Sequence, residues 1–163
     1  MKKDEFIFLV IVFLILSAFF IKCLFYLDPD FSWHLRMGQI ISSSSIPQKD
    51  PFSYTMSSFP FIDHEWLTNV VFWRLYTFWG KLGLSLLYSL IAFSSLIILV
   101  ANSLSRKPQK ILKKLTPLLL GGSLILDYVG VRPQVQSWFL LSILLVLVLN
   151  EEIWLKYRFF YHF

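Results

Sequence analysis

Two short acidic segments, each containing a histidine, stand at the two ends of one polar stretch of this sequence. The first is Asp28-Pro29-Asp30-Phe31-Ser32-Trp33-His34, and the second is Asp63-His64-Glu65. A carboxylate in either segment can act as a general base toward a hydroxyl group, helped where partial burial disfavours its charged form. Alternatively, Asp30 and Glu65 can hold a divalent cation, Mg²⁺ or Mn²⁺, that neutralises a phosphate leaving group. The spacing is diagnostic of neither chemistry, so both stay open.

A purely structural role explains part of the same pattern. Asp30 or Ser32 can cap a short helix, and a helix that starts at Asp30 places His34 one turn later on the same face. The apolar residues of that helix form one stripe: Trp33, Met37, Ile40 and Ile41. Such a helix is expected on the membrane surface, with the tryptophan at the level of the lipid headgroups. Asp63 can likewise cap the helix that follows it, with Glu65 in the first turn.

The composition indicates what kind of protein must position these segments. Of the 163 residues, 56% are hydrophobic and only 15% are charged, and the mean hydropathy is +0.65. One soluble core cannot bury several long uncharged runs, which excludes a soluble enzyme and a disordered chain. The net charge of +5 comes from basic residues beside these runs, where they determine topology, so nucleic acid is not expected as a partner. The lone cysteine, Cys23, predicts neither an internal disulfide nor a zinc site.

Four apolar runs predict one all-α, polytopic membrane domain over residues 1–163. The spans are expected at about 6–26, 80–101, 115–131 and 134–150, with short interfacial helices in the loop 27–66. We interpret the first run as an uncleaved anchor, because no small residues mark a cleavage site after it. The third run is interrupted by Pro117 and Gly121-Gly122, so it either spans or re-enters the membrane. The last two runs predict a tight helical hairpin, closed by an Asp127–Arg132 ion pair.

The basic residues predict the orientation. With the N-terminus in the cytoplasm, nine Lys and Arg residues fall in the inner segments: Lys2, Lys3, Arg106, Lys107, Lys110, Lys113, Lys114, Lys156 and Arg158. The outer segments hold three: Arg36, Lys49 and Arg132. Because basic residues concentrate on the cytoplasmic side, this distribution predicts a multi-pass protein of the inner (plasma) membrane, with a cytoplasmic N-terminus and loop 27–66 outside.

Four blocks of residues follow one another along residues 28–140. They are Asp28-x-Asp30-x-x-Trp33-His34-Leu35-x-x-Gly38, Ile46-Pro47-x-x-Asp50-Pro51-Phe52-Ser53-Tyr54-Thr55, His64-Glu65-Trp66-Leu67 and Arg132-Pro133-Gln134. As an ordered set, they resemble the N-terminal part of bacterial polytopic glycosyltransferases of the GT-C type, similar to dolichyl-phosphate-mannose mannosyltransferases. Members of this type are considerably longer. The resemblance therefore implies an N-terminal part of a longer protein, completed by further C-terminal spans or by a partner membrane protein.

The resemblance also implies an activity and a set of site residues. The activity is that of an integral membrane hexosyltransferase of the cell envelope, which transfers a sugar from a polyprenyl-phosphate-linked donor on the extracytoplasmic face. Asp30 would be the catalytic or metal-proximal carboxylate, with Asp28 beside it. Substrate binding would fall to three further residues: His34, His64 and Glu65. Arg132 would bind lipid phosphate, and the expected partners are membrane lipid and the lipid-linked sugar donor.

Two functions of other classes stay open. A non-catalytic membrane protein could bind or translocate a lipid-linked saccharide, or act as a scaffold for a partner, and would then tolerate neutral substitutions of the loop carboxylates. A proton- or ion-coupled transporter could also use carboxylates and histidine. The transporter is the weaker alternative, because the acidic residues lie in the loop and not midway through the spans.

Overall fold

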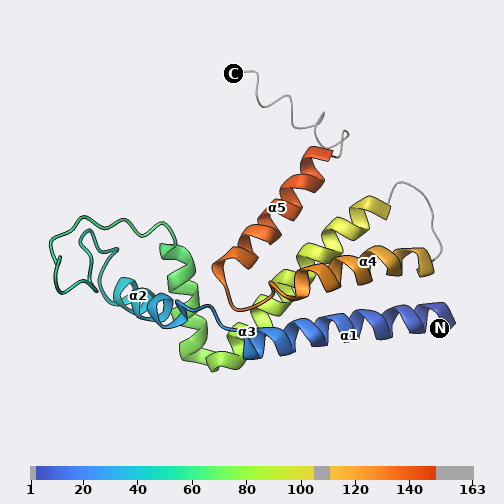
Figure 1. Cartoon of the computed structure of the whole chain (residues 1–163), viewed down its shortest axis with the longest axis horizontal. Coiled ribbons are helices and arrows are strands. Elements are labelled where there is room, and N and C mark those ends of the chain that lie inside the picture. The colour runs from blue at the N-terminus through green and yellow to red at the C-terminus, as the bar shows by residue number, and fades with distance from the viewer. Residues whose placement is uncertain (1–2, 105–110, 150–163) are drawn as a thin grey trace, which may run out of the picture.

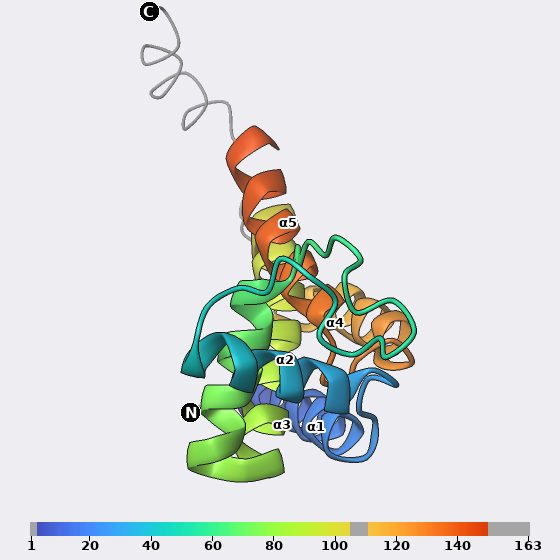
Figure 2. The ribbon, with the colours of Figure 1, turned by 90° about the vertical axis from the view of Figure 1, so that its left-hand side faces the viewer.

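The computed structural model describes residues 3–104 and 111–149 of the chain. Within these ranges the chain forms five helices and no strand: α1 (Lys3–Phe25), α2 (Phe31–Ser43), α3 (Trp66–Leu104), α4 (Ile111–Leu126) and α5 (Pro133–Leu149). The all-helical part of the prediction is thereby confirmed. The helices α2 and the first part of α3, together with the loop between them, gather at the end of the molecule opposite the N-terminus (Figure 1). Viewed from that end, α1 is nearly end-on (Figure 2).

Two helices are long and apolar enough to cross a membrane, Lys3–Phe25 and Trp66–Ala101. The apolar helices Leu115–Leu126 and Pro133–Leu149 are shorter. The third apolar run was expected to reach residue 131, but α4 ends at Leu126. Beyond it, the backbone N–H of Val131 donates to the carbonyl of Tyr26 at 3.1 Å, a bond that a helix reaching residue 131 would not make. Proline then opens α5 at its first position, where a missing N–H leaves no helical bond unmade.

Helix α3 is broken at Gly80 into two segments. Gly80 has φ 61° and ψ −158°, a backbone region open essentially to glycine alone. The segments before and after it run in different directions (Figure 1). The break falls at residue 80, where the second span was expected to begin, and it separates the aromatic-rich stretch 66–79 from the uncharged run that follows. The first segment is therefore free to pack against α2, while the second packs with α1.

Substituting Gly80 by alanine is expected to destabilise the protein although the position has open space around it. Beyond the adjacent backbone of its own helix, no atom lies within 4 Å of the point that a Cβ would occupy. The penalty therefore comes from backbone strain, about 1–3 kcal/mol. Thermal unfolding in detergent micelles measures the effect, with Thr77→Ala on the same exposed stretch as the control. An unchanged unfolding temperature for Gly80→Ala would show that the backbone can leave this conformation without cost.

The helices pack around a core that α3 shares with its neighbours. Both α1 and α5 pack on α3, and α4 packs on α1 and α3, whereas the described residues of α4 and α5 make no contact with each other. The predicted hairpin of α4 with α5 is therefore wrong. The predicted ion pair that would close it is also absent among the described residues: the carboxylate of Asp127 lies 4.0 Å from Lys22 Nζ, not against Arg132, and is largely exposed. The fully buried core side chains include Phe19, Phe72, Leu84, Tyr88, Leu118 and Val135.

At Gly38, helix α2 packs so closely against the first segment of α3 that no side chain fits between the two backbones. A Cβ added to Gly38 would lie 1.9 Å from the carbonyl oxygen of Asn69. Only a residue without a side chain therefore allows α2 to approach this closely. Met37, next to it, is fully buried, and the face of α2 that carries His34 is pressed against α3. This contact determines which residue of α3 stands opposite the histidine.

Candidate functional site

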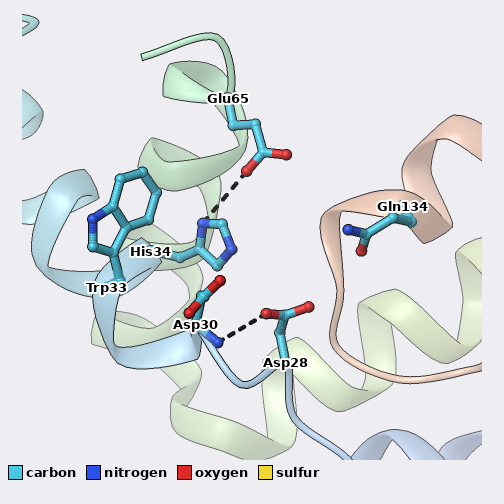
Figure 3. Close-up of a pocket in the computed structure, with 6 residues that line it drawn as sticks. All are labelled: Asp28, Asp30, Trp33, His34, Glu65 and Gln134. Atoms are coloured by element: carbon cyan, nitrogen blue, oxygen red, sulfur yellow. Dashed lines mark hydrogen bonds and ion pairs between the residues drawn. The ribbon is translucent and has the colours of Figure 1, made fainter. Parts of the chain in front are cut away.

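A polar pocket of about 330 Å³ lies where α2, the start of α3 and the start of α5 come together. Its lining comes from three separate parts of the chain (Figure 3): Asp28, Asp30, Trp33, His34, Glu65 and Gln134. Four of these residues were predicted as site residues from the sequence, and the structure brings the two acidic segments together. None of the six lining residues is a lysine or an arginine.

The connection between α1 and α2 holds two carboxylates at the edge of the pocket. The backbone N–H of Asp28 donates to the carbonyl of Val131 at 3.1 Å, which ties this connection to the one before α5. The side chain of Asp28 accepts a hydrogen bond from the backbone N–H of Asp30 at 2.9 Å (Figure 3). Asp28 is thus held in place by two hydrogen bonds.

Asp30 occupies the N-cap position of α2, one of the two positions, Asp30 or Ser32, that the sequence predicted for the cap. Its carboxylate makes no capping hydrogen bond, however. The side chain is exposed and points toward the open volume of the pocket, close to the His34 ring in Figure 3. A carboxylate at a helix N-terminus is favoured by the helix dipole even without a cap. Asp30 is therefore a charged group available to a bound molecule.

His34 is buried, and its ring is part of a chain of polar side chains. Nδ1 lies 2.7 Å from Oδ1 of Asn69, and Asn69 Nδ2 donates to Oδ2 of Asp63 at 2.8 Å. The other oxygen of Asp63 accepts from the backbone N–H of Glu65 at 3.0 Å. Oε2 of Glu65 lies 3.8 Å from His34 Nδ1 (Figure 3). Asp63 was predicted to cap α3, but it lies before the N-cap: it accepts from the backbone of Glu65 and also orients Asn69.

Glu65 lies two residues earlier relative to its helix than predicted. Helix α3 begins at Trp66, and the carbonyl of Glu65 accepts the first helical bond from Asn69 N–H at 3.0 Å. Glu65 is therefore the N-cap residue and not a residue of the first turn. This position turns its half-buried side chain toward the pocket.

Aromatic side chains of α2 and the loop pack together beside the pocket. The ring of Trp33 contacts His34 edge-on at 5.2 Å and packs against two loop rings, Phe52 at 5.9 Å and Phe61 at 6.4 Å. His34 also packs on Phe72 of α3, with centroids 5.3 Å apart. Trp33 is half-buried between these loop rings and the pocket, and its predicted place at the lipid headgroups stays a prediction. It offers part of a ring to a bound molecule.

Two predicted site residues lie outside the pocket. His64 is exposed and does not line it. Arg132 is half-buried, and its Nε has no hydrogen-bond partner among the described residues; the side chain packs beside Gly130. Gln134, in the same Arg-Pro-Gln block, lines the pocket instead. No group of three or more His, Cys, Asp or Glu side chains within residues 3–104 and 111–149 could hold a metal ion, so the proposed cation stays a prediction without a ligand set.

Sequence reasoning missed Asn69 and Gln134 as site residues. Asn69 is fully buried, and an amide among the mostly apolar residues 66–73 is the signal that could have found it. Gln134 belongs to a block that the sequence singled out for its arginine. No protein-family model matches this sequence, and neither does any curated protein or solved structure.

The site therefore combines carboxylates, one imidazole and one amide around a small volume beside a tryptophan ring. Ionised carboxylates only accept hydrogen bonds, so the pocket suits a ligand that is rich in hydroxyl donors. A lining without lysine or arginine makes it a poor pocket for a bare phosphate. Its carboxylates and imidazole can accept hydrogen bonds from hydroxyl or amine groups, and they can also accept a proton.

Proposed function

We propose that the chain is a multi-pass membrane protein with its N-terminus in the cytoplasm. The support is the outward face of its helices, where large apolar side chains are exposed: Phe13 at 66%, Leu14 at 58%, Leu124 at 73% and Leu140 at 65%. Such a surface is unfavourable in water and suits lipid. In this arrangement α1, the second segment of α3, α4 and α5 cross the membrane, and the polar pocket lies at the extracytoplasmic end of α1.

The proposed activity is transfer of a sugar from a polyprenyl-phosphate-linked donor on the extracytoplasmic face. The observation that carries it is the convergence of Asp28, Asp30 and Glu65 with His34 in one pocket, at the end of α1 remote from the N-terminus. Those residues belong to the blocks that resemble GT-C glycosyltransferases. The pocket accepts hydrogen bonds from sugar hydroxyls, and the Trp33 ring offers an apolar face for a sugar ring.

In this proposal the acceptor hydroxyl attacks the anomeric carbon as the bond to the phosphate oxygen breaks. The electron pair of that bond leaves with the phosphate, and the configuration at the carbon inverts. Asp30 accepts a hydrogen bond from the attacking hydroxyl, which increases its nucleophilicity. Asp28, fixed by the backbone of Asp30 and Val131, holds the connection in place. Arg132, near the pocket but outside its lining, is the candidate contact for the lipid phosphate.

A non-catalytic protein that binds or translocates a lipid-linked saccharide is the second candidate. It is favoured by the lining itself, because six residues without a lysine or arginine recognise hydroxyls better than a departing phosphate. Both candidates share sugar recognition in the same pocket. They differ in whether a covalent bond is broken there.

A transfer assay with the chain in proteoliposomes distinguishes these candidates. Radiolabelled polyprenyl-phosphate sugars are supplied with an acceptor polyprenol or glycan, and both binding and product are measured. Turnover supports the transferase, whereas saturable binding without product favours the second candidate. Neither binding nor turnover with any hexose tested would overturn the assignment of the pocket to sugars.

The proposed orientation predicts a labelling pattern. Tyr54 is 94% exposed in the loop, and Lys3 is exposed at the start of α1. In a Cys23→Ala background, a membrane-impermeant maleimide should label Tyr54→Cys in intact spheroplasts but label Lys3→Cys only after permeabilisation. The two single-cysteine variants serve as each other's control. Labelling with the reverse pattern would contradict the cytoplasmic N-terminus.

A further inference from the structure

The hydrogen bonds beside the pocket determine which nitrogen of His34 carries a proton. Asp63, as a carboxylate, can only accept, so Asn69 must turn its Nδ2 toward Asp63 at 2.8 Å. The Asn69 oxygen is thereby turned toward His34, 2.7 Å from Nδ1. An amide oxygen can only accept. Nδ1 of His34 therefore carries the hydrogen and donates it.

A neutral imidazole with its hydrogen on Nδ1 has a lone pair on Nε2. In Figure 3, Nδ1 is the nitrogen on the Glu65 side of the ring, and the second nitrogen faces the open part of the pocket, toward the side of Asp28 and Gln134. His34 as a residue is only 4% exposed, and Asn69 is fully buried. Because both side chains are buried, water does not readily replace the hydrogen bonds that fix the His34 ring and the Asn69 amide.

We propose that His34 is a catalytic residue that accepts the proton of the acceptor hydroxyl at Nε2, with Asn69 and Asp63 as positioning residues. This inference rests on the proposed transferase function. As the hydroxyl oxygen bonds to the anomeric carbon and the phosphate oxygen departs with its electron pair, the O–H proton moves to Nε2. His34 becomes an imidazolium, whose Nδ1–H remains bonded to Asn69 and faces Glu65 at 3.8 Å. The Asp30 carboxylate orients the hydroxyl and stabilises the new positive charge.

The isosteric substitution Asp63→Asn tests the positioning role. Asparagine at this position can still accept from Glu65 N–H with its oxygen, which leaves its NH₂ facing Asn69. All hydrogen bonds then survive only if Asn69 flips and presents its own NH₂ to His34. Nδ1 must become the acceptor, so the hydrogen moves to Nε2 and the pocket loses its lone pair. The double variant Asp63→Asn/Asn69→Asp places a carboxylate directly against Nδ1–H and should restore the original tautomer.

Nitrogen-15 NMR of histidine-labelled protein in nanodiscs reads the tautomer without any need for activity. The His34 signals are those absent from His34→Gln. We expect Nδ1–H in the wild type, Nε2–H in Asp63→Asn, and Nδ1–H again in the double variant. A wild-type signal with the hydrogen on Nε2, or no change in a folded Asp63→Asn, would overturn the proposal.

The transfer assay tests the catalytic role. His34→Gln and Asp63→Asn are expected to lower kcat by about 100-fold or more with little change in KM, and the double variant should recover most of the loss. Asp127→Asn, outside the pocket and 89% exposed at its side chain, is the matched control and should retain full activity. A wild type without turnover would overturn the proposed function and this proton transfer with it, while the tautomer measurement still tests the positioning residues. Full activity of His34→Gln in an active wild-type background would overturn the catalytic role alone.

Discussion

Replacing Asp30 by asparagine is expected to abolish sugar transfer while leaving the protein folded and inserted. The amide has the shape of the carboxylate but no negative charge. It therefore accepts a weaker hydrogen bond from the attacking hydroxyl and does not stabilise the His34 imidazolium. Loss of a charged group that orients the hydroxyl and stabilises the imidazolium is expected to lower the rate by about 10²–10⁴-fold. The fold should be insensitive, because the Asp30 side chain makes no capping bond and is exposed.

The measurement is initial velocity in proteoliposomes at saturating donor, with the amount of folded protein normalised by size-exclusion chromatography. Asp50→Asn is the matched control from the same loop, residues 27–66. Asp50 accepts from the backbone of Phe52 and Ser53 in the loop and does not line the pocket, and the oxygen of asparagine can accept the same bonds. Retained transfer by Asp30→Asn would remove Asp30 from the mechanism.

Adding one methyl group at Gly38 is expected to disturb both the fold and the pocket. The new Cβ would lie 1.9 Å from the carbonyl oxygen of Asn69 and 2.8 Å from the Cβ of Trp73, and both neighbours belong to the body of α3. Helix α2 would have to move away, at a cost of about 1–3 kcal/mol. The same movement would break the His34–Asn69 hydrogen bond, so Gly38→Ala should lose both thermal stability and sugar binding.

Gly122→Ala is the matched control, since Gly122 is also a buried glycine within a helix. A Cβ there would lie 3.4 Å from Cγ2 of Ile15, which is ordinary van der Waals contact. Alanine is the better helix former by up to about 1 kcal/mol, so this variant should unfold at the same temperature as the wild type or higher. Equal unfolding temperatures for Gly38→Ala and Gly122→Ala would contradict the close approach of α2 and α3.

The sequence predicted the helical class and the long apolar helices well, because uninterrupted apolar runs are a local signal. It failed where a helix is positioned by a distant part of the chain. The expected hairpin assumed that two helices joined by a short connection pack together. Residues 127–132 instead bond to the connection after α1, through Val131, and this turns α5 onto α3. Neither the connection after α1 nor residues 127–132 contain a local sequence signal that predicts this pairing.

The lining of the candidate pocket was anticipated to a similar extent, and for a similar reason. Asp28, Asp30, His34 and Glu65 were recognisable by residue type, since carboxylates and histidine at the ends of one loop suggest chemistry. Asn69 and Gln134 carry no such signal. Their roles follow from which helices pack together, and for Asn69 that depends on the missing side chain of Gly38. The opposite error occurred at His64 and Arg132. Each lies close in sequence to a residue that lines the pocket, Glu65 or Gln134, but does not line it itself.

The backbone pairing between the connections before α2 and before α5 has a consequence for biosynthesis. The amide of Asp28 has its acceptor on Val131, a residue made more than a hundred positions later. Chains are synthesised from the N-terminus, so Asp28 and Asp30 leave the ribosome before the stretch of backbone that bonds Asp28 exists. Until residue 131 has been made, the amide of Asp28 lacks its acceptor and the pocket lacks the residues contributed by the start of α5. The nascent chain thus passes through an interval in which both acidic segments have been synthesised but the pocket cannot yet form.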